Sequence, residues 1–188
     1  MNLAGPQPTL ISPLCIIRPF TPDDAPDLAA KAGHREIART TLRIPHPYCE
    51  SQARDYIHST HTAWAEGKGA SFAIIERTSA ALAGGVGLTF EPAHHHAELG
   101  YWIAVDSWGK GLATDAAARI IDWALGELGL SRIHAHAFSS NPASLRVLEK
   151  IGMKHEGTLR RHIHKWNQVH DAILYGLLRE EWLSQRPA

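Results

Sequence analysis

One junction decides the fold: the strand-like run ELGYWIAV at residues 98–105 leads through two polar residues into WGKGLAT at residues 108–114. The aromatic and β-branched run predicts a buried strand. Apolar residues from Ala113 to Leu128 then recur at helical spacing and predict a helix that ends at Gly129. Glycines between a strand and a helix let the backbone approach an anion, and the free N–H groups and dipole of the helix start favour negative charge.

This turn predicts a phosphate site between Gly109 and Thr114, although a tight turn that merely needs glycine explains the same residues. Two other nucleotide motifs do not fit. A P-loop has four residues between its glycines and ends in Gly-Lys-Ser/Thr, and a dinucleotide fingerprint has Gly or Ala where Thr114 stands. The stronger signal is a second segment, NPASLRVLEKIGM at residues 141–153, which follows the next predicted strand.

The flanking sequence predicts alternating strands and helices around this junction. Strands are expected at residues 14–18, 71–76, 82–90, 132–138, 154–161 and 169–177, and helices after Thr21 and at residues 51–66 and 141–151. The order predicts an α/β (α+β) fold, a mixed and largely antiparallel twisted sheet flanked by helices, with one parallel crossover around the central helix. We expect a single domain over residues 14–188, preceded by a loose arm at residues 1–13.

Composition argues against several classes of partner. Lys plus Arg total 19 and Asp plus Glu total 19, so no basic surface for nucleic acid is expected. Cys15 and Cys49 lie in unrelated segments without a CxxC pattern, which favours a reducing, cytoplasmic compartment. The first 13 residues contain no basic start and no apolar run long enough for a signal peptide or a membrane span, so no membrane partner is expected.

Four pieces of sequence in this order resemble one family. They are Leu14 to Phe20 with Thr21-Pro22-Asp23-Asp24, Ala97 to Ile103, Trp108 to Ala116, and Asn141-x-x-Ser144 through Met153. From Leu14 to about Trp182 the chain resembles the GNAT acetyltransferase superfamily, and within it the ribosomal-protein N-terminal acetylases of the RimJ/RimL type. The resemblance implies a GNAT-like fold and an N-acetyltransferase that moves an acetyl group from acetyl-CoA to a primary amine.

The acceptor that the resemblance suggests first is the N-terminal amine of a protein or peptide. Acetylation of a small amine, an amino acid or an antibiotic stays open, as does a non-catalytic acyl-CoA-binding module. The segments expected to shape the acceptor groove, residues 40–48 and 162–170, carry no readable specificity code. Trp166 and Trp182, expected to be exposed, are compatible with a homodimer.

The resemblance also implies which residues bind acetyl-CoA. Backbone amides of the glycine turn would hold the pyrophosphate, the pantetheine arm would lie along the end of the preceding strand, and Asn141 would contact the cofactor. The expected cofactor-binding residues are Ile103, Val105, Trp108, Gly109, Lys110, Gly111, Leu112, Ala113, Thr114 and Asn141.

Acetyl transfer from a thioester to an amine requires a neutral amine and a protonated or tolerated thiolate. Glu98, at the start of the strand, is the expected base, with a solvated strand-end acid as the alternative. Many relatives use a tyrosine as general acid where this chain has Leu148. Ser144 is the expected substitute, as acid or sulfur contact, with an ordinary first-turn serine as the alternative.

Histidines raise the question of a metal. His134 and His136 share one face of a predicted strand, and residues 94–96 are three consecutive histidines. No HExxH or Cys/His ligand set occurs, and alternating histidines are more typical of a polar sheet face. We therefore expect no metal site.

Overall fold

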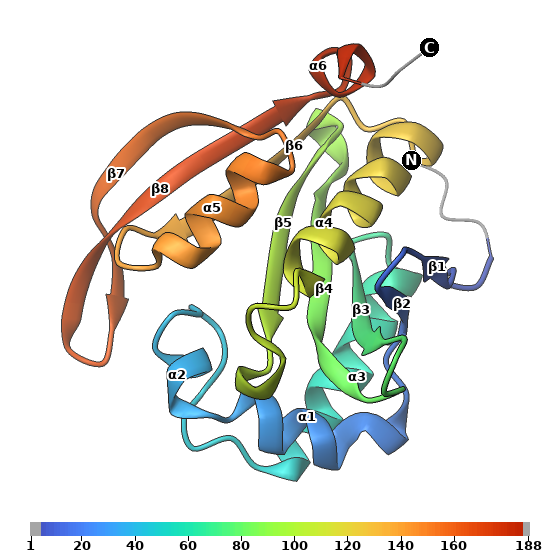
Figure 1. Cartoon of the computed structure of the whole chain (residues 1–188), viewed down its shortest axis with the longest axis vertical. Coiled ribbons are helices and arrows are strands. Elements are labelled where there is room, and N and C mark those ends of the chain that lie inside the picture. Colours follow the sequence, from blue (N-terminus) through green and yellow to red (C-terminus); the bar gives the residue numbers. More distant parts are fainter. Residues whose placement is uncertain (1–4, 186–188) are drawn as a thin grey trace.

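The computed structural model describes residues 5–185. Eight strands form one sheet in the order β1-β2-β3-β4-β5-β6-β8-β7 (Figure 1). All neighbouring strands are antiparallel except β5 and β6, which run parallel. The strands are β1 (Leu10–Ile11), β2 (Cys15–Pro19), β3 (Gly69–Glu76), β4 (Leu82–Glu91), β5 (His96–Ile103), β6 (Arg132–Phe138), β7 (Lys154–Lys165) and β8 (Gln168–Leu178). The predicted sheet with one parallel crossover is confirmed.

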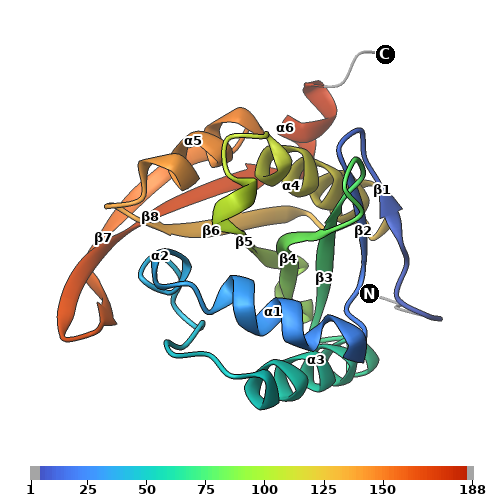
Figure 2. The ribbon, with the colours of Figure 1, turned by 60° about the horizontal axis from the view of Figure 1, so that its bottom comes forward.

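Helices cover both faces of this sheet (Figure 2). One face carries α1 (Ala25–Ala32), α2 (Arg35–Ala38) and α3 (Glu50–Ala65), and the other carries α4 (Leu112–Asp122) and α5 (Pro142–Lys150). The short helix α6 (Arg179–Ser184) follows β8. Short turns complete the set, namely the 3₁₀ turns η1 (Pro22–Asp24), η2 (Pro92–His94) and η3 (Val105–Ser107) and the π-helical turn η4 (Trp123–Glu127). No helix among residues 5–185 is long and apolar enough to cross a membrane.

Two packed layers hold β5 from both sides. On the α4 face, Ala116, Ala117 and Ile120 are completely buried, and the small alanine side chains allow the helix to lie close to the sheet. On the α1–α3 face, Phe20 and Leu28 belong to a second buried cluster that Trp102 contacts. Because successive residues of a strand point to opposite faces, β5 supplies side chains to both layers and is fixed in place by both.

The structure differs from two expected boundaries around the central junction. The strand expected to reach Val105 ends at Ile103, because the chain turns into η3, where Ser107 N donates to Ala104 O. The helix expected to run to Leu128 is α-helical only to Asp122. It continues as the π-helical η4, in which Leu128 N donates to Trp123 O.

The N-terminal arm is also more ordered than expected where it is described. Leu10 and Ile11 pair with β2 as β1. Ser12 Oγ donates to Asp115 Oδ2 at 2.5 Å, and Leu14 N donates to the same oxygen at 3.0 Å. The carboxylate of Asp115 therefore ties the arm to the first turn of α4. The prediction of a loose arm fails for residues 10–13, and residues 1–4 lie outside the described part.

Asp24 is a buried carboxylate that organises the entry into α1. Its oxygens accept hydrogen bonds from both Arg18 Nη atoms and from Thr21 N, each at 2.7 Å. Burial alone would raise the pKa of Asp24, but the bonds from Arg18 and Thr21 outweigh it and lower the pKa below its ordinary 3.8. A lowered folded-state pKa means that the ionised carboxylate stabilises the fold above that ordinary value and loses this contribution as pH falls.

We expect Asp24→Asn to lower the free energy of unfolding by about 2–3 kcal/mol near neutral pH, because hydrogen bonds to a charged group are lost inside the protein. The difference from wild type should shrink as the pH falls from the ordinary value of 3.8 through the lowered folded-state pKa, because wild type then gives up the contribution of its ionised carboxylate. Urea unfolding at pH 7 and pH 3 measures both quantities. An equal difference at the two pH values would contradict the role of the ionised carboxylate.

Candidate active site

The parallel strands β5 and β6 separate soon after they start (Figure 1). They pair over only three residue pairs, His96↔Arg132, Ala97↔Ile133 and Glu98↔His134. Beyond Glu98, β5 stays paired with β4 and β6 with β8, but the two edges no longer pair with each other. An unpaired strand edge presents backbone N–H and C=O groups to any extended chain placed beside it. We call this opening between Leu99–Ile103 and Ala135–Phe138 the β5–β6 wedge.

The glycine turn follows at the end of β5. Gly109 and Gly111 have φ values of 78° and 81°, in the left-handed region that glycine adopts without strain. Gly111 is the N-cap of α4 and supplies no side-chain cap, and the first helical hydrogen bond runs from Asp115 N to Gly111 O. The amides of Leu112, Ala113 and Thr114 lie ahead of that bond and have no intrahelical acceptor. The turn therefore presents helix-start amides suited to a phosphate group.

Two side chains brace this turn. Trp108 Nε1 donates to Ile103 O at 2.8 Å, while the residue is 49% exposed, so Trp108 covers the turn rather than entering the core. Lys110 Nζ lies 3.1 Å from Glu76 Oε1 at the end of β3. Bonds from Ser79 and then Lys110 lower the pKa of Glu76, so this carboxylate is a ready partner for the lysine. Lys110 thus lies beside the free amides and is held by an ion pair.

Glu98 lies where the wedge begins to open. Its Oε1 is 3.0 Å from His136 Nδ1, across the gap between β5 and β6. Its side chain is 37% exposed, and its place in β5 puts it on the same face as Trp102, the α1–α3 face. The neighbouring His134 is more buried, and that burial lowers its pKa while the charge of Glu98 opposes the shift. A carboxylate therefore stands at the wedge, accessible to solvent and oriented by an imidazole.

Similarity to known proteins agrees with this geometry. A family model for the acetyltransferase (GNAT) domain matches residues 15–154. The chain belongs to the GNAT acetyltransferases. It is accordingly an acetyl-CoA-dependent N-acetyltransferase, as the resemblance of its motifs implied.

Three individual proteins illustrate the relationship. The N-acetyltransferase YoaA of Bacillus subtilis, itself uncharacterized, is 29% identical over 92% of this chain and 97% of its own length. YdaF of Bacillus subtilis, named as a candidate ribosomal N-acetyltransferase, is 36% identical over 51% of this chain and 52% of its own. The solved structure of RimL, an acetyltransferase of ribosomal protein L7/L12 in complex with coenzyme A, shares the fold with a TM-score of 0.82 at 16% identity, over 89% and 96% of the two chains.

A pair of hydroxyl groups lies on the α5 side of the wedge of this GNAT domain. Tyr101 Oη is 2.8 Å from Ser144 Oγ and also donates to Ser144 O at 3.2 Å. Burial raises the pKa of Tyr101 to about 12, so the phenol stays protonated at physiological pH. Ser144 could be predicted from its motif but its partner could not, because Tyr101 is 43 residues away in the chain. The one signal in the sequence was strand alternation, which places Tyr101 and the other odd-numbered residues of β5 on the side of the helices α4 and α5.

The other two residues of the α5 motif have structural contacts. Asn141 Oδ1 accepts a hydrogen bond from Ser144 N at 3.2 Å and caps α5. Leu148, where the resemblance implied a general acid in other members of the family, is 1% exposed within the core. The side chain of Leu148 therefore fills the core, and the hydroxyls of Tyr101 and Ser144 take the place beside the wedge.

The two segments expected to shape the acceptor groove meet on the Glu98 side of the sheet. Lys165, at the end of β7, donates to Ile44 O at 2.8 Å and to Leu42 O at 3.2 Å. The neighbouring Trp166 ring lies 6.0 Å from the ring of His46. The tip of the β7–β8 hairpin thus rests on the loop between α2 and α3, next to α2 in both ribbon views (Figures 1 and 2).

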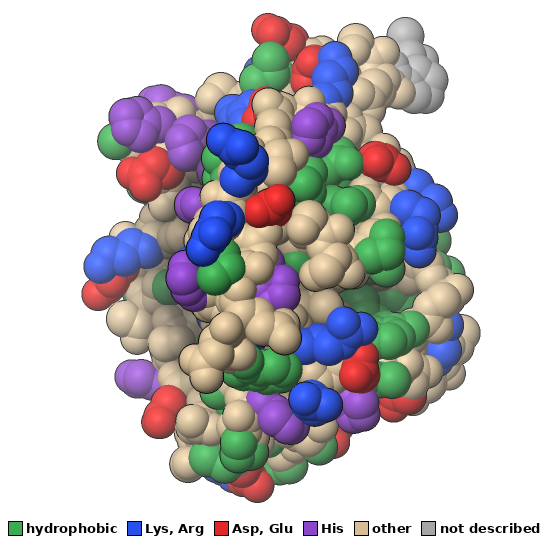
Figure 3. Space-filling view, turned by 90° about the vertical axis from the view of Figure 1, so that its left-hand side faces the viewer, with side chains coloured by type: hydrophobic (Ala, Val, Ile, Leu, Met, Phe, Trp, Pro, Cys, Tyr) green, Lys and Arg blue, Asp and Glu red, His purple; other side chains and the backbone are tan. Residues whose placement is uncertain are grey.

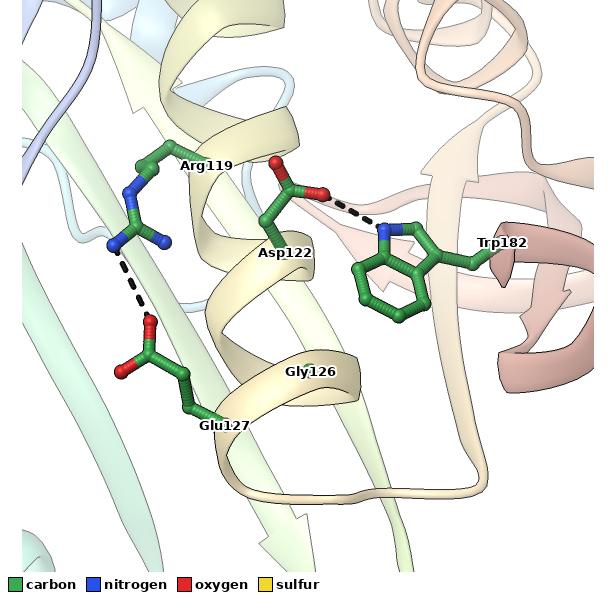
Figure 4. A pocket seen from close by; sticks show the side chains of 5 residues that line it. All are labelled: Arg119, Asp122, Gly126, Glu127 and Trp182. Carbon is green, nitrogen blue, oxygen red and sulfur yellow. Dashed lines mark hydrogen bonds and ion pairs between the residues drawn. The ribbon is translucent and has the colours of Figure 1, made fainter. Parts of the chain in front are cut away.

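A separate hollow lies at the far end of α4 (Figure 4). Trp182 Nε1 donates to Asp122 Oδ1 at 2.7 Å there, and Arg119 and Glu127 form an ion pair at 3.4 Å. Gly126 lies under the Trp182 ring, where a Cβ atom would be 3.2 Å from it. The expectation of an exposed Trp182 is wrong, because α6 folds this ring against α4. These contacts show that the hollow lies at the packing interface between α4 and α6 and is not part of the wedge.

Proposed function

We propose that this GNAT enzyme acetylates the N-terminal amine of a protein or peptide, with Glu98 as the base that receives the amine proton. The observation that carries the proposal is the position of the Glu98 carboxylate. It stands where β5 and β6 separate, is oriented by His136 and lies on the α1–α3 face of the sheet.

Different groups around the wedge would bind different parts of acetyl-CoA. We propose that the amides from Gly109 to Thr114 hold the pyrophosphate of acetyl-CoA, with Lys110 adding positive charge. The free edge of β5 near Ile103 and Val105 would pair with the amide groups of the pantetheine arm. Acetyl-CoA supplies the acetyl group as a thioester. A Cβ atom at Gly109 would meet nothing within 4 Å, so the space directly beside this glycine is open.

The chemical roles follow from which groups flank the wedge. Glu98 takes the proton from the acceptor ammonium, directly or through a water molecule, and His136 holds the carboxylate in position. The freed amine then forms the N–C bond as the C–S bond breaks. Ser144, backed by the protonated Tyr101, donates a proton to the departing sulfur, and the second proton that the nitrogen loses as it becomes an amide replaces the proton that Ser144 gave. The carboxylate and the hydroxyl pair lie on opposite sides of β5, which matches the opposite directions of the two proton transfers.

Support for a protein or peptide acceptor comes from the hairpin contact and from one relative. The contact between the hairpin and residues 42–44 lies on the same side of the sheet as Glu98 and leaves 37% of the Glu98 side chain exposed. YdaF carries a ribosomal N-acetyltransferase name. Small amines, amino acids and antibiotics are the alternative acceptors within the same enzyme class.

An acceptor panel with mass-spectrometric readout tests this choice. It contains a lysine-free peptide with a free N-terminus, the same peptide with a blocked N-terminus and one lysine, a free amino acid, a polyamine and an aminoglycoside. We expect acetylation of the free N-terminus, with the blocked peptide inert. Preference for the polyamine, the amino acid or the aminoglycoside would reject a peptide acceptor while keeping the enzyme class.

We expect Tyr101→Phe and Ser144→Ala each to lower kcat about 10-fold with little change in acetyl-CoA affinity. A thiolate is a tolerable leaving group, so the loss of its proton donor should cost less than the 10²–10⁴-fold typical of acid–base residues. Steady-state thiol release and calorimetry separate the two quantities. Wild-type kcat in both variants would remove the hydroxyl pair from the mechanism.

A further inference from the structure

Five histidines form a continuous row across the sheet beside Glu98. Ring centroids are separated by 5.9 Å from His94 to His96, 5.1 Å to His134, 5.7 Å to His136 and 6.2 Å to His162. Figure 3 shows several histidine side chains at the surface of the face turned to the viewer. We call these five residues the histidine row. Three strands and the turn η2 contribute to the row. The sequence showed only that two of these histidines share a face of one strand, not that the others lie beside them.

Three members of this neighbourhood present ligand atoms to a common point. Single donor atoms of Glu98, His134 and His136 all lie within 4.8 Å of one another, and the pair Glu98 Oε1 and His136 Nδ1 is already at 3.0 Å. Zinc binds imidazole nitrogen and carboxylate oxygen at about 2.0–2.2 Å in tetrahedral geometry, which places ligand atoms roughly 3.3 Å apart. Two imidazoles and one carboxylate leave a fourth position for water.

The surroundings favour a cation at this point. Glu98 supplies a negative charge, and Arg132, the nearby cation on β6, is neutralised by its paired hydrogen bonds to Glu156. His134 and His136 come from one strand held on the β8 side throughout its length, so their spacing is fixed by the sheet. The next ring in the row, His96, has a buried Nδ1 without a hydrogen-bond partner among residues 5–185. A polar atom left unpaired this way indicates that the row is not a fully satisfied structural network.

We propose that Glu98, His134 and His136 form a binding site for a divalent transition metal such as Zn²⁺, and that metal bound there stops acetyl transfer. We expected no metal site from the sequence, because no ligand motif occurs along the chain. The structure supplies the missing third ligand from a different strand. The inhibitory part rests on the proposed function, because the metal would occupy the carboxylate that otherwise receives the amine proton.

Metal binding is tested on the full chain without acetyl-CoA, after removal of metals by a chelator. Zn²⁺ calorimetry and Co²⁺ absorption are measured for wild type, His134→Ala, His136→Asn and the control His58→Ala, an exposed histidine on α3. We expect one tight site in wild type and in His58→Ala, with a tetrahedral Co²⁺ spectrum. Each of the other variants should bind at least about 10-fold more weakly, since even the outer partners of metal ligands contribute that much.

Two results would overturn the site: Zn²⁺ affinity in His134→Ala and His136→Asn equal to that of wild type, or an octahedral Co²⁺ spectrum in wild type. Circular dichroism without metal keeps a folding defect separate from ligand loss. Inhibition is measured next as thiol release with increasing Zn²⁺, and we expect it to follow the occupancy found by calorimetry. Binding without any turnover in the acceptor panel would reject the proposed function and leave the metal site standing. Turnover unaffected at full occupancy would reject the inhibition alone.

Discussion

Replacing Glu98 by Gln should lower turnover about 10²–10⁴-fold while acetyl-CoA affinity stays within twofold of wild type. The substitution keeps the size of the side chain and its place beside His136, and removes only the ability to accept a proton. The loss should therefore appear in kcat. Calorimetry with acetyl-CoA and thiol-release kinetics on the best acceptor measure the two effects.

The pH dependence of this variant distinguishes a base from a structural carboxylate. An α-amino group has a pKa near 7.7–8.0, so above about pH 8.5 most of the acceptor is already neutral and needs no base. We expect the ratio of wild-type to variant turnover to shrink above that pH. An aliphatic amine with a pKa near 10.4 would keep the ratio large to higher pH. A ratio independent of pH for a peptide acceptor would contradict the role of Glu98 as base.

Replacing Gly111 by Val should weaken acetyl-CoA binding about 10- to 100-fold. Its φ of 81° is strained for a β-branched residue, so the turn must shift and at least one amide loses its place against the phosphates. One hydrogen bond to a charged group contributes about 1.5–3 kcal/mol, which corresponds to this range of affinity.

Gly67→Val is the matched control for this prediction. Gly67 has a φ of 67° and open space around its Cβ position, and it follows α3 away from the wedge. Both variants should lose thermal stability through backbone strain, but only Gly111→Val should lose acetyl-CoA affinity. Equal affinity losses in the two variants, or none in either, would show that the turn does not hold the cofactor.

The sequence predicted those parts of the fold that depend on local pattern. The alternation in 132–138 predicted β6 with the correct bounds, and the glycines at 109 and 111 predicted a turn that the structure shows at positive φ. Long-range contacts could not be predicted in the same way. The N-terminal arm joins the sheet because Ser12 and Leu14 bond to Asp115, about a hundred residues away.

In the candidate site, too, residues in local motifs could be predicted and residues brought together by long-range contacts could not. Glu98 and Ser144 could be selected because they stand in recognisable segments, and the structure places both beside the wedge. Their partners could not, since Tyr101 and His136 become neighbours only through the register of β5, β6 and α5. Trp182 was wrongly predicted to be exposed for the same reason. Its ring is held against α4 by a hydrogen bond to Asp122, a residue far away in the sequence.

The central claim is that this chain binds acetyl-CoA at the β5–β6 wedge and transfers its acetyl group to an amine. One preparation of the full chain tests it, through acetyl-CoA calorimetry followed by thiol release against the acceptor panel. We predict binding of one acetyl-CoA per chain and thiol release with at least one primary amine, with release strongly reduced in Glu98→Gln. Absence of acetyl-CoA binding by the folded wild-type protein would contradict the account.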